Sequence, residues 1–524
     1  MKILQSLVGI YALTLLISSL VFHAKATVQG NIKDGNNSLI ATDSYRRYKE
    51  DIKLLKDLGV DSYRFSISWS RILPKGSLCG GINQEGIDFY NNLINEVIAN
   101  GMKPFVTILH FDTPQALEDK YGGFLGRPIV DDFKDYSELL FKTYGDRVKH
   151  WITINEPFVV ALGYDLGKGA PGRCSLPPPV GPCPAVGNSS TEPYIVSHNF
   201  ILAHAAAAKL YKAKYQKIQG GEIGIVVVGE FMEPLTDTED DKEAAIRYMD
   251  FLFGWYLEPL IFGDYPQIMR DYVQERLPIF TIEEKRLIRG SLDFIGVNYY
   301  TSRYAYKSQP VEPKHYIGDS LATITTLKDG VLIGPKARNR YVYSYPIGLQ
   351  KLLEYMNIKY RNPVIYITEN GYPDANVPDR PLQDSLSDQV RIDYITQHLY
   401  YTKEAINLRV FPPTDHADYL ARHNHPLAVV RRLHRPLFLP GQGSIPYCNA
   451  HFQASIGSFT PNGLMALILQ MHTRSLRIDD TTLRPQQKCF QSMLCPQLTL
   501  HRKTSRRSPS EISRGQASLS VGVL

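Results

Sequence analysis

Apolar residues recur at alternating helical and strand spacings between residues 42 and 407. In the first helical stripe, Tyr45, Tyr48, Ile52 and Leu55 share one face, and Gly59 marks the end of the helix. Further helices are predicted at 87–100, 131–144 and around 196–215, and apolar stripes at 349–356 and 395–406 predict two more. Runs of β-forming residues predict six strands, at 61–69, 103–110, 148–155, 223–229, 292–300 and 364–368.

This alternation of strands with helices predicts a parallel sheet. The pattern alone leaves two architectures open, an open doubly wound sheet and a closed (β/α)8 barrel. Candidate functional residues at the ends of several strands favour the barrel, in which chemistry gathers at the carboxyl ends of the strands. The absence of a glycine-rich nucleotide fingerprint argues against the open sheet.

The alternation stops after residue 407. Prolines interrupt residues 408–524, and the end of this segment is rich in Arg, Ser, Gln and Thr. We therefore expect three regions: a signal peptide at 1–26, a (β/α) barrel at 27–407, and a weakly ordered, disordered tail at 408–524.

The N-terminus has the features of a secretory signal. Lys2 precedes a mostly apolar stretch at 4–22, and Ala24-Lys25-Ala26 is a small-residue cleavage site. An uncleaved membrane anchor is the alternative, because the apolar stretch approaches spanning length. The cleavage site favours a signal peptide, so we expect entry into the secretory pathway and no stable membrane insertion after cleavage.

An exported chain can keep disulfides. Cys174 and Cys183 flank a proline-rich loop with few apolar side chains, and we expect a disulfide between them. The other four cysteines show no recognisable pairing and no zinc-type spacing, so we expect neither a metal nor a cofactor. Asn36 and Asn188 each begin a glycosylation sequon.

The composition of the 524-residue chain is that of a soluble globular protein, with 44% hydrophobic and 21% charged residues. Its formal net charge of +6 comes from the tail, because residues 408–524 contain 14 Lys/Arg and 5 Asp/Glu, whereas the rest contains 44 and 47. These basic residues are too scattered for a binding patch, so we expect no nucleic-acid partner. A tail-driven nucleic-acid or membrane-surface protein is the weakest hypothesis, and the oligomeric state is not predicted.

Two of the predicted strands end in a glutamate followed by a turn breaker. These are Glu156, which precedes Pro157, and Glu369, which precedes Asn370 and Gly371. A carboxylate at the tip of a buried strand is costly to keep without a use, and two such strands predict two carboxylates aimed at one point. Glycoside hydrolysis uses such a pair, one acid that protonates the leaving oxygen and one carboxylate that attacks the sugar.

Six segments resemble, in the same order, motifs of the family-one glycoside hydrolases, particularly the plant β-glucosidases. They are YRFSISWSRI at 63–72, HFDTP at 110–114, TINEP at 153–157, APGRCS at 170–175, DFIGVNYY at 293–300 and ITENG at 367–371. The resemblance covers residues 42–405 and implies a (β/α)8 barrel. It also implies a retaining mechanism, in which the two carboxyl groups lie about 5 Å apart.

The resemblance implies roles for individual residues. Glu156 corresponds to the general acid and base, and Glu369 to the nucleophile. Arg64 and Tyr300 correspond to the residues that contact the nucleophile and keep it ionised and oriented. The substrate-binding residues implied are His110, Asn155 and Asn298. The non-functional alternatives are a structural ion pair for Arg64, packing of the barrel for Tyr300 and a structural role for His110. Three other acids have no comparable support from the motifs: Glu192, Glu230 and Glu233.

The chain also departs from the family. The family's first strand, with its sugar-binding glutamine, and its eighth strand, with a tryptophan-rich sugar-binding segment, have no counterpart in this sequence. Phe111 stands where the family has tryptophan. We therefore predict an incomplete barrel with strands 2–7 recognisable and two unpaired sheet edges.

The leading hypothesis is a β-glucosidase of the extracellular apoplast or the vacuole, acting on a small-molecule β-glucoside or an oligosaccharide. The alternative is a catalytically impaired or inactive truncated or splice product, at most a weak sugar-binding protein. The sequence does not specify the aglycone, whose pocket we expect in loops at 158–169 and 302–345. It also does not distinguish hydrolysis from transglycosylation.

Overall fold

In the described part of the chain, six parallel strands form the central sheet. The computed structural model describes residues 42–408 except 168, 177–182, 184, 339–340, 375–379, 382 and 385–386. Neighbouring strands are all parallel. Their order across the sheet is β1 (Ser62–Ser66), β2 (Lys103–Leu109), β3 (His150–Asn155), β6 (Glu222–Val228), β8 (Phe294–Asn298) and β13 (Ile365–Glu369). They coincide with the six predicted strands, and their ends differ from the predicted ends by at most three residues.

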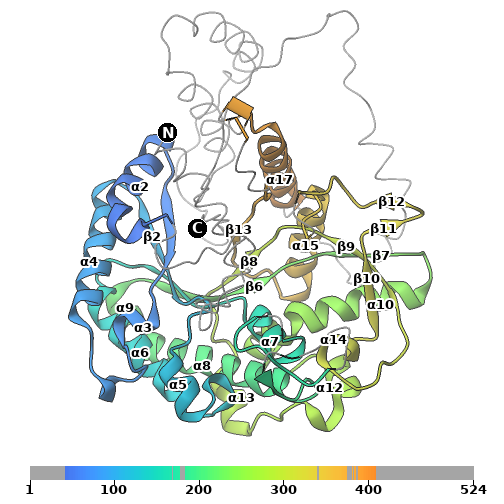
Figure 1. Cartoon of the computed structure of the whole chain (residues 1–524), viewed down its shortest axis with the longest axis horizontal. Helices are drawn as coiled ribbons and strands as arrows, with labels where there is room; N and C mark the ends of the chain where they lie inside the picture. The colour runs from blue at the N-terminus through green and yellow to red at the C-terminus, as the bar shows by residue number, and fades with distance from the viewer. Residues whose placement is uncertain are drawn as a thin grey trace, which may run out of the picture.

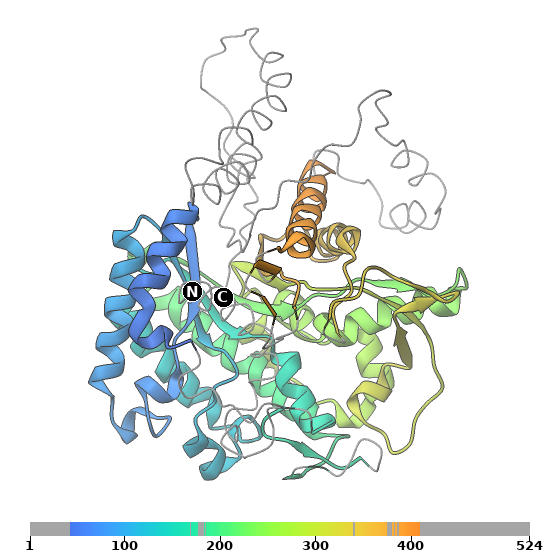
Figure 2. The same ribbon diagram turned by 45° about the horizontal axis from the view of Figure 1, so that its top comes forward.

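The long helices lie outside the curled sheet (Figure 1). They are α2 (Ser44–Leu58), α4 (Gln84–Ala99), α6 (Ile129–Tyr144), α8 (Glu192–Lys214), α15 (Pro346–Lys359) and α17 (Gln389–Leu408). The last two pack side by side next to β8 and β13 (Figures 1 and 2). Shorter helices are α3 (Trp69–Ile72), α5 (Gln115–Tyr121), α7 (Pro157–Asp165), α9 (Gln216–Gln219), α10 (Glu239–Met249), α11 (Trp255–Phe262), α12 (Gln267–Val273), α13 (Ile282–Ile288) and α14 (Tyr316–Asp319), with η2 (Leu78–Gly80), η3 (Gly123–Leu125), η4 (Asp250–Gly254) and η5 (Gln274–Arg276).

The two faces of the sheet pack into separate cores. Strand side chains alternate between faces, and those of the outer face join one large apolar cluster with the helices. Gly224 leaves space for the ring of Phe294, because a Cβ added at residue 224 would lie 2.6 Å from that ring. The inner cluster takes one side chain from each of five successive strands: Phe105, Ile152, Val226, Phe294 and Tyr366. A curled parallel sheet with a packed inner layer and helices on its outer face is the arrangement of a (β/α)8 barrel, of which the described residues form six strands. The predicted fold class, a partial barrel, is confirmed.

The described residues also form three smaller sheets beside the barrel. The largest has the order β10 (Ala322–Thr325), β9 (Arg303–Lys307) and β7 (Met232–Pro234), and the two-stranded sheets pair β11 (Leu327–Lys328) with β12 (Val331–Leu332) and β4 (Arg173–Cys174) with β5 (Ala185–Val186). The prediction of loops at 158–169 and 302–345 was therefore wrong in part, because these segments contain α7 and β9–β12. Pro157 suits the first turn of α7, and that helix is mostly apolar, so it shows no amphipathic stripe.

The predicted strand at 61–69 ends earlier, at Ser66. Trp69 begins α3 instead, and the side chain of Asp112 accepts a hydrogen bond from its backbone N–H over 3.0 Å. The chain thus leaves the sheet after Ser66 and continues as α3.

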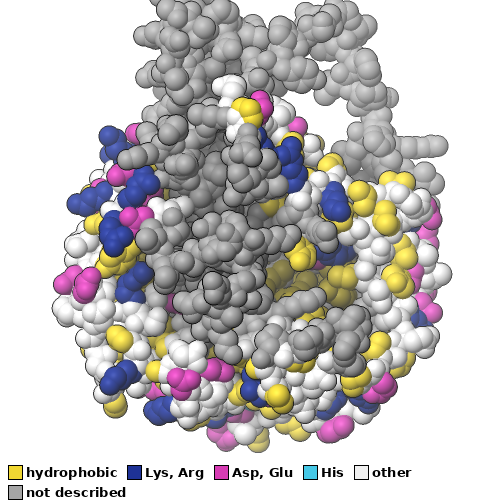
Figure 3. Space-filling view, viewed as in Figure 1, with side chains coloured by type: hydrophobic (Ala, Val, Ile, Leu, Met, Phe, Trp, Pro, Cys, Tyr) yellow, Lys and Arg dark blue, Asp and Glu magenta, His cyan; other side chains and the backbone are white. Residues whose placement is uncertain are grey.

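Several predictions concern residues outside the described part of the chain. These are the signal peptide at 1–26, Asn36, the tail beyond residue 408, and the missing first and eighth strands. Among the described helices, none is both long enough and apolar enough to cross a bilayer. Basic and acidic side chains of the described residues are interspersed on the face seen in Figure 3.

Candidate active site

Two glutamates lie at the carboxyl ends of β3 and β13. Glu156 separates β3 from α7 in a left-handed backbone conformation (φ 43°), and Glu369 is the last residue of β13. Both are buried, with 5% and 6% of their surface exposed. Because parallel strands end at one edge of the sheet, both carboxylates face the same site. The strained backbone of a non-glycine residue marks the tip of β3 as a place where position matters.

Charge and hydrogen bonds fix both oxygens of Glu369. Arg64 Nη1, from β1, donates to Oε1 over 2.6 Å, and the Arg64 side chain is fully buried. Tyr300, just beyond β8, donates its hydroxyl to Oε2. Burial raises the pKa of the Tyr300 hydroxyl well above its ordinary value, so it remains a neutral donor. A guanidinium cation and a phenol thus compensate the charge of this buried carboxylate.

Asn155, the last residue of β3, links Arg64 to His110. Arg64 Nη2 donates to Asn155 Oδ1 over 2.6 Å. A guanidinium has only donors, so this contact fixes the amide with Nδ2 facing His110 Nε2, 3.2 Å away. That ring nitrogen must accept, which makes His110 a neutral imidazole with its proton on Nδ1. Burial, aided by the charge of Arg64, lowers the pKa of His110 well below its ordinary value and favours the same form.

Glu156 is held in its protonated form. Burial, and next the negative charge of Glu369, raises its pKa to about 8. Asn298, the last residue of β8, donates from Nδ2 to Glu156 Oε1 over 2.5 Å and also contacts Asn155 Oδ1 at 3.3 Å. Thr368 orients this amide by donating its hydroxyl to Asn298 Oδ1 over 2.6 Å. Because Oε1 accepts a hydrogen bond, Oε2 is left to carry the proton.

One hydrogen-bonded network therefore joins the seven predicted catalytic and substrate-binding residues: Arg64, His110, Asn155, Glu156, Asn298, Tyr300 and Glu369. Two further members escaped sequence reasoning. Thr368 orients Asn298, and Asp112 accepts hydrogen bonds from the backbone N–H groups of Trp69 and His110. Burial raises the pKa of Asp112 to about 6. The only sequence signal for Asp112 was its place in the HFDTP motif.

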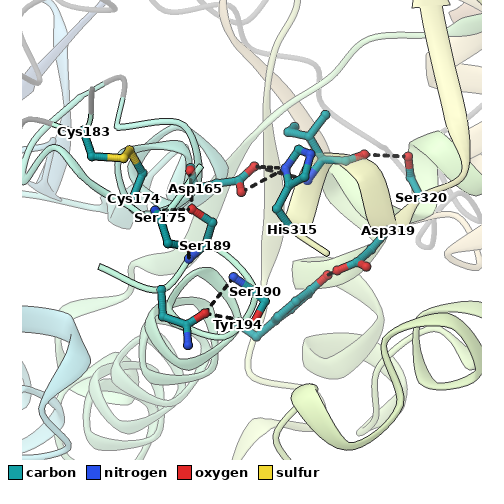
Figure 4. A network of polar contacts seen from close by, with 12 residues as sticks. Asp165, Cys174, Ser175, Cys183, Ser189, Ser190, Tyr194, His315, Asp319 and Ser320 are labelled. Carbon is teal, nitrogen blue, oxygen red and sulfur yellow. Dashed lines mark hydrogen bonds and ion pairs between the residues drawn. A yellow bond between two sulfur atoms is a disulfide. The ribbon is translucent and has the colours of Figure 1, made fainter. Parts of the chain in front are cut away.

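A second polar network ties the segment after α7 to neighbouring segments (Figure 4). Cys174 and Cys183 form a disulfide, with Cα atoms 5.3 Å apart. The backbone N–H of Ser175 donates to Ser189 Oγ, and the backbone N–H of Ser189 donates to Ser175 Oγ. Ser189 Oγ donates in turn to the carbonyl of Asp165. Figure 4 shows the buried carboxylate of Asp165 pointing at the ring of His315.

The remaining predicted positions have ordinary surroundings. Asn188 is exposed at the start of its sequon, and its side-chain oxygen accepts hydrogen bonds from Ser190. Glu192 pairs with Arg173, Glu230 with Arg303 and Glu233 with Lys351.

Comparisons with known proteins give a consistent result. Residues 21–412 match the family model described as glycosyl hydrolase family 1. Beta-glucosidase 12 of Oryza sativa subsp. indica is 51% identical over 378 residues, which span 72% of this chain and 74% of the relative. Furostanol glycoside 26-O-beta-glucosidase of Hellenia speciosa is 53% identical over 379 residues, spanning 72% of this chain and 66% of the relative.

Solved structures agree. A rice beta-glucosidase mutant in a covalent complex with glucose superposes with a TM-score of 0.72 at 46% identity, covering 74% of this chain and 81% of that one. A beta-glucosidase of the fungus Humicola insolens in complex with glucose superposes with a TM-score of 0.70 at 39% identity, covering 74% and 80%.

Proposed function

Because the chain belongs to glycosyl hydrolase family 1, we propose that it is a retaining β-glucosidase. It removes a terminal β-D-glucosyl residue from a small aglycone or an oligosaccharide. One observation carries the mechanism: the buried Arg64 guanidinium is paired with Glu369. Burial, and next the charge of Glu369, raises the pKa of Glu156 to about 8, which favours its protonated form. The site thus contains one acid and one charge-compensated carboxylate, the pair that a double displacement requires.

In the first step, a carboxylate oxygen of Glu369 attacks the anomeric carbon. The bond between this carbon and the aglycone oxygen breaks, and the Oε2 proton of Glu156 moves to the departing oxygen. A covalent glucosyl ester on Glu369 forms, and the free alcohol leaves.

In the second step, water replaces the aglycone. Esterification removes the negative charge of Glu369, which is one of the two causes that raise the pKa of Glu156. The pKa of Glu156 therefore falls, and its carboxylate takes a proton from the water as the water oxygen attacks the anomeric carbon. The ester bond breaks, Glu156 is protonated again, and two inversions give net retention.

Asn155 and His110 are proposed to contact the sugar hydroxyls. Asn155 keeps one Nδ2 hydrogen beyond the one it donates to His110. The neutral His110 offers a donor at Nδ1. Donors fixed by other side chains before the substrate arrives lose little entropy on binding.

We further propose that the chain enters the secretory pathway, reaches the apoplast or vacuole, and carries a glycan on Asn188. The export signal and the exposure of Asn188 support this. A mass decrease on endoglycosidase treatment, absent in Ser190→Ala, would support glycosylation at Asn188. An unchanged mass in a chain purified from a secreting cell would contradict it.

The direct test of the reaction is hydrolysis of an aryl β-glucoside by the purified full-length chain, with the anomer of the first-formed glucose identified by NMR. We expect β-glucose first, and a loss of turnover in Glu156→Gln. Glu222→Gln is the matched control. Glu222 is the first residue of β6, accepts a hydrogen bond from Tyr366 and takes no part in the proposed reaction. Absence of turnover in folded protein would favour a non-catalytic sugar-binding protein.

A further inference from the structure

Helix α17 contacts the strand ends that carry the candidate nucleophile. It packs beside α15, next to β8 and β13 (Figures 1 and 2). Tyr394 of this helix is 2% exposed and donates its hydroxyl to the backbone carbonyl of Tyr300 over 2.8 Å. The same hydroxyl accepts a hydrogen bond from Asn370 Nδ2 at 3.2 Å. A helix outside the barrel thus reaches the backbone of the residue that contacts Glu369.

The contact lies where the regular strand pairing fails. The β8–β13 ladder is regular up to Ile367 and shifts in register between Ile367 and Glu369. Beyond that point, Tyr299 donates its N–H to the carbonyl of Glu369 over 3.0 Å, and Asn370 Nδ2 donates to the carbonyl of Tyr299 over 2.8 Å. At the tips that carry Tyr300 and Glu369, one backbone hydrogen bond therefore remains, and the side chains of Asn370 and Tyr394 add to it.

The ring of Tyr394 is itself fixed by packing. It lies against His398, with ring centroids 3.8 Å apart, and near Tyr372 at 5.2 Å. Burial lowers the pKa of His398 to about 3, so its imidazole is neutral, and Nδ1 donates to the carbonyl of Tyr394 over 2.7 Å. Packing of the ring therefore fixes the position of the Tyr394 hydroxyl, and the Tyr300 carbonyl is its acceptor.

We propose that Tyr394 is a positioning residue of the glycosidase reaction, acting through Tyr300 on the orientation of Glu369. It touches no reacting atom. Its hydroxyl, together with Asn370, holds the Tyr300 backbone so that the Tyr300 phenol meets the nucleophile. This inference rests on the proposed function. Misplacement of a catalytic group by about 1 Å can lower rates about 100-fold, so partial loosening of Tyr300 should lower kcat about 10-fold.

A double-mutant cycle tests the inference. Wild type, Tyr394→Phe, Tyr300→Phe and the double variant are compared for kcat and KM on an aryl β-glucoside. We expect Tyr394→Phe in the wild-type background to lower kcat about 10-fold, with KM changed less than about 2-fold. In the Tyr300→Phe background, the same substitution should lower kcat by less than about 2-fold. Tyr144→Phe is the control, because its buried hydroxyl also donates to a backbone carbonyl, that of Ile87, outside the site. This control should keep wild-type kcat.

Two results would overturn the inference in an active enzyme: unchanged kcat in Tyr394→Phe, or an equal loss of kcat with and without the Tyr300 hydroxyl. The second result would mean a general structural role. A wild-type chain without turnover would instead contradict the proposed function, and the inference with it. If Tyr394→Phe does not fold, Asn370→Ser removes the hydrogen bonds from Nδ2 to Tyr394 and Tyr299, and the same criteria apply.

Discussion

Glu156 and Glu369 are the same amino acid at the tips of two parallel strands, and their neighbours separate their roles. Glu369 meets a cation, Arg64, whereas Glu156 meets a neutral amide, Asn298, and faces the charge of Glu369. Burial raises the pKa of Glu156, the charge of Glu369 acts in the same direction, and the hydrogen bond from Asn298 acts against both. The proposed division into acid and nucleophile therefore rests on the Arg64 cation, which is paired with Glu369, and on the negative charge that Glu156 faces.

The pKa of Glu156 predicts where activity falls on the alkaline side of the pH–rate profile, its alkaline limb. The acid must be protonated in the first step, so kcat/KM for an alkyl β-glucoside should fall above about pH 8. A dinitrophenyl β-glucoside, whose leaving group needs no proton, serves as the control and should show a weaker limb. A limb below pH 6 for the alkyl substrate would contradict the assignment of Glu156 as the acid.

Asn298 should tune that limb in a defined direction. Its hydrogen bond favours the ionised form of Glu156 and lowers the pKa. Asn298→Ala should therefore move the alkaline limb to higher pH, with kcat reduced about 10-fold through poorer placement of the acid. Thr368→Ser, which keeps the hydroxyl that orients Asn298, is the control. A limb that stays in place or moves to lower pH in Asn298→Ala would refute this role.

At the scale of elements, the sequence predicted the regular parts and missed the irregular ones. The strands ending near Glu156 and Glu369 were predictable because apolar runs and turn breakers are local signals. Helix α7 was missed because it is mostly apolar, which hides its period. The side chains of Asp112 and Tyr394 form hydrogen bonds to backbone groups. The partner of Tyr394 lies 94 residues away in the sequence, a separation that no local pattern encodes. In the sequence, Tyr394 could be recognised only as part of a helix.

The pair of Asp165 and His315 gives a prediction at this scale, because it joins α7 to the segment before α14. The hydrogen bond to Asp165 raises the pKa of His315 above its ordinary value of 6.5. The pair should stabilise the fold fully below pH 6.5 and progressively less as pH rises through the raised pKa. His315→Gln should lower the free energy of unfolding by about 3 kcal/mol at pH 5.5 and by less at pH 8.

Urea unfolding at both pH values measures this difference. His150→Gln is the matched control, because burial lowers the pKa of His150 to about 4, and the ring stays neutral throughout this range. Its effect on stability should change in the opposite direction, because the unfolded His150 binds a proton below about pH 6.5 whereas the folded ring does not, so His150→Gln should cost more at pH 8 than at pH 5.5. An effect of His315→Gln that grows towards pH 8 would contradict the account.

At the scale of the whole molecule, the active-site ion pair spans the sheet. β1 and β13 stand at opposite ends of the strand order, yet Arg64 of β1 lies 2.6 Å from Glu369 of β13. Only a strongly curled sheet allows this contact. Arg64 therefore has two tasks: it compensates the charge of Glu369, the proposed nucleophile, and it ties the two ends of the described sheet together.

Removal of Arg64 should destabilise the molecule because it leaves a buried, unpaired carboxylate. Arg64→Met should lower the free energy of unfolding by about 3–5 kcal/mol, and adding Glu369→Gln should restore part of the loss. Arg127→Met is the control, because Arg127 is half exposed in its pair with Glu284 and should cost less than about 1 kcal/mol. Urea midpoints that are equal for the two arginine variants would contradict the role of Arg64.

The most direct test of the central claim is covalent labelling of the full-length, folded chain with a 2-deoxy-2-fluoroglucoside that carries a good leaving group. Mass spectrometry then locates the adduct. We predict one 2-deoxy-2-fluoroglucosyl equivalent, on Glu369, because the fluorine slows both steps whereas the good leaving group speeds only the formation of the ester. No adduct, or an adduct on another residue, would contradict the assignment of Glu369 as the nucleophile of a retaining β-glucosidase.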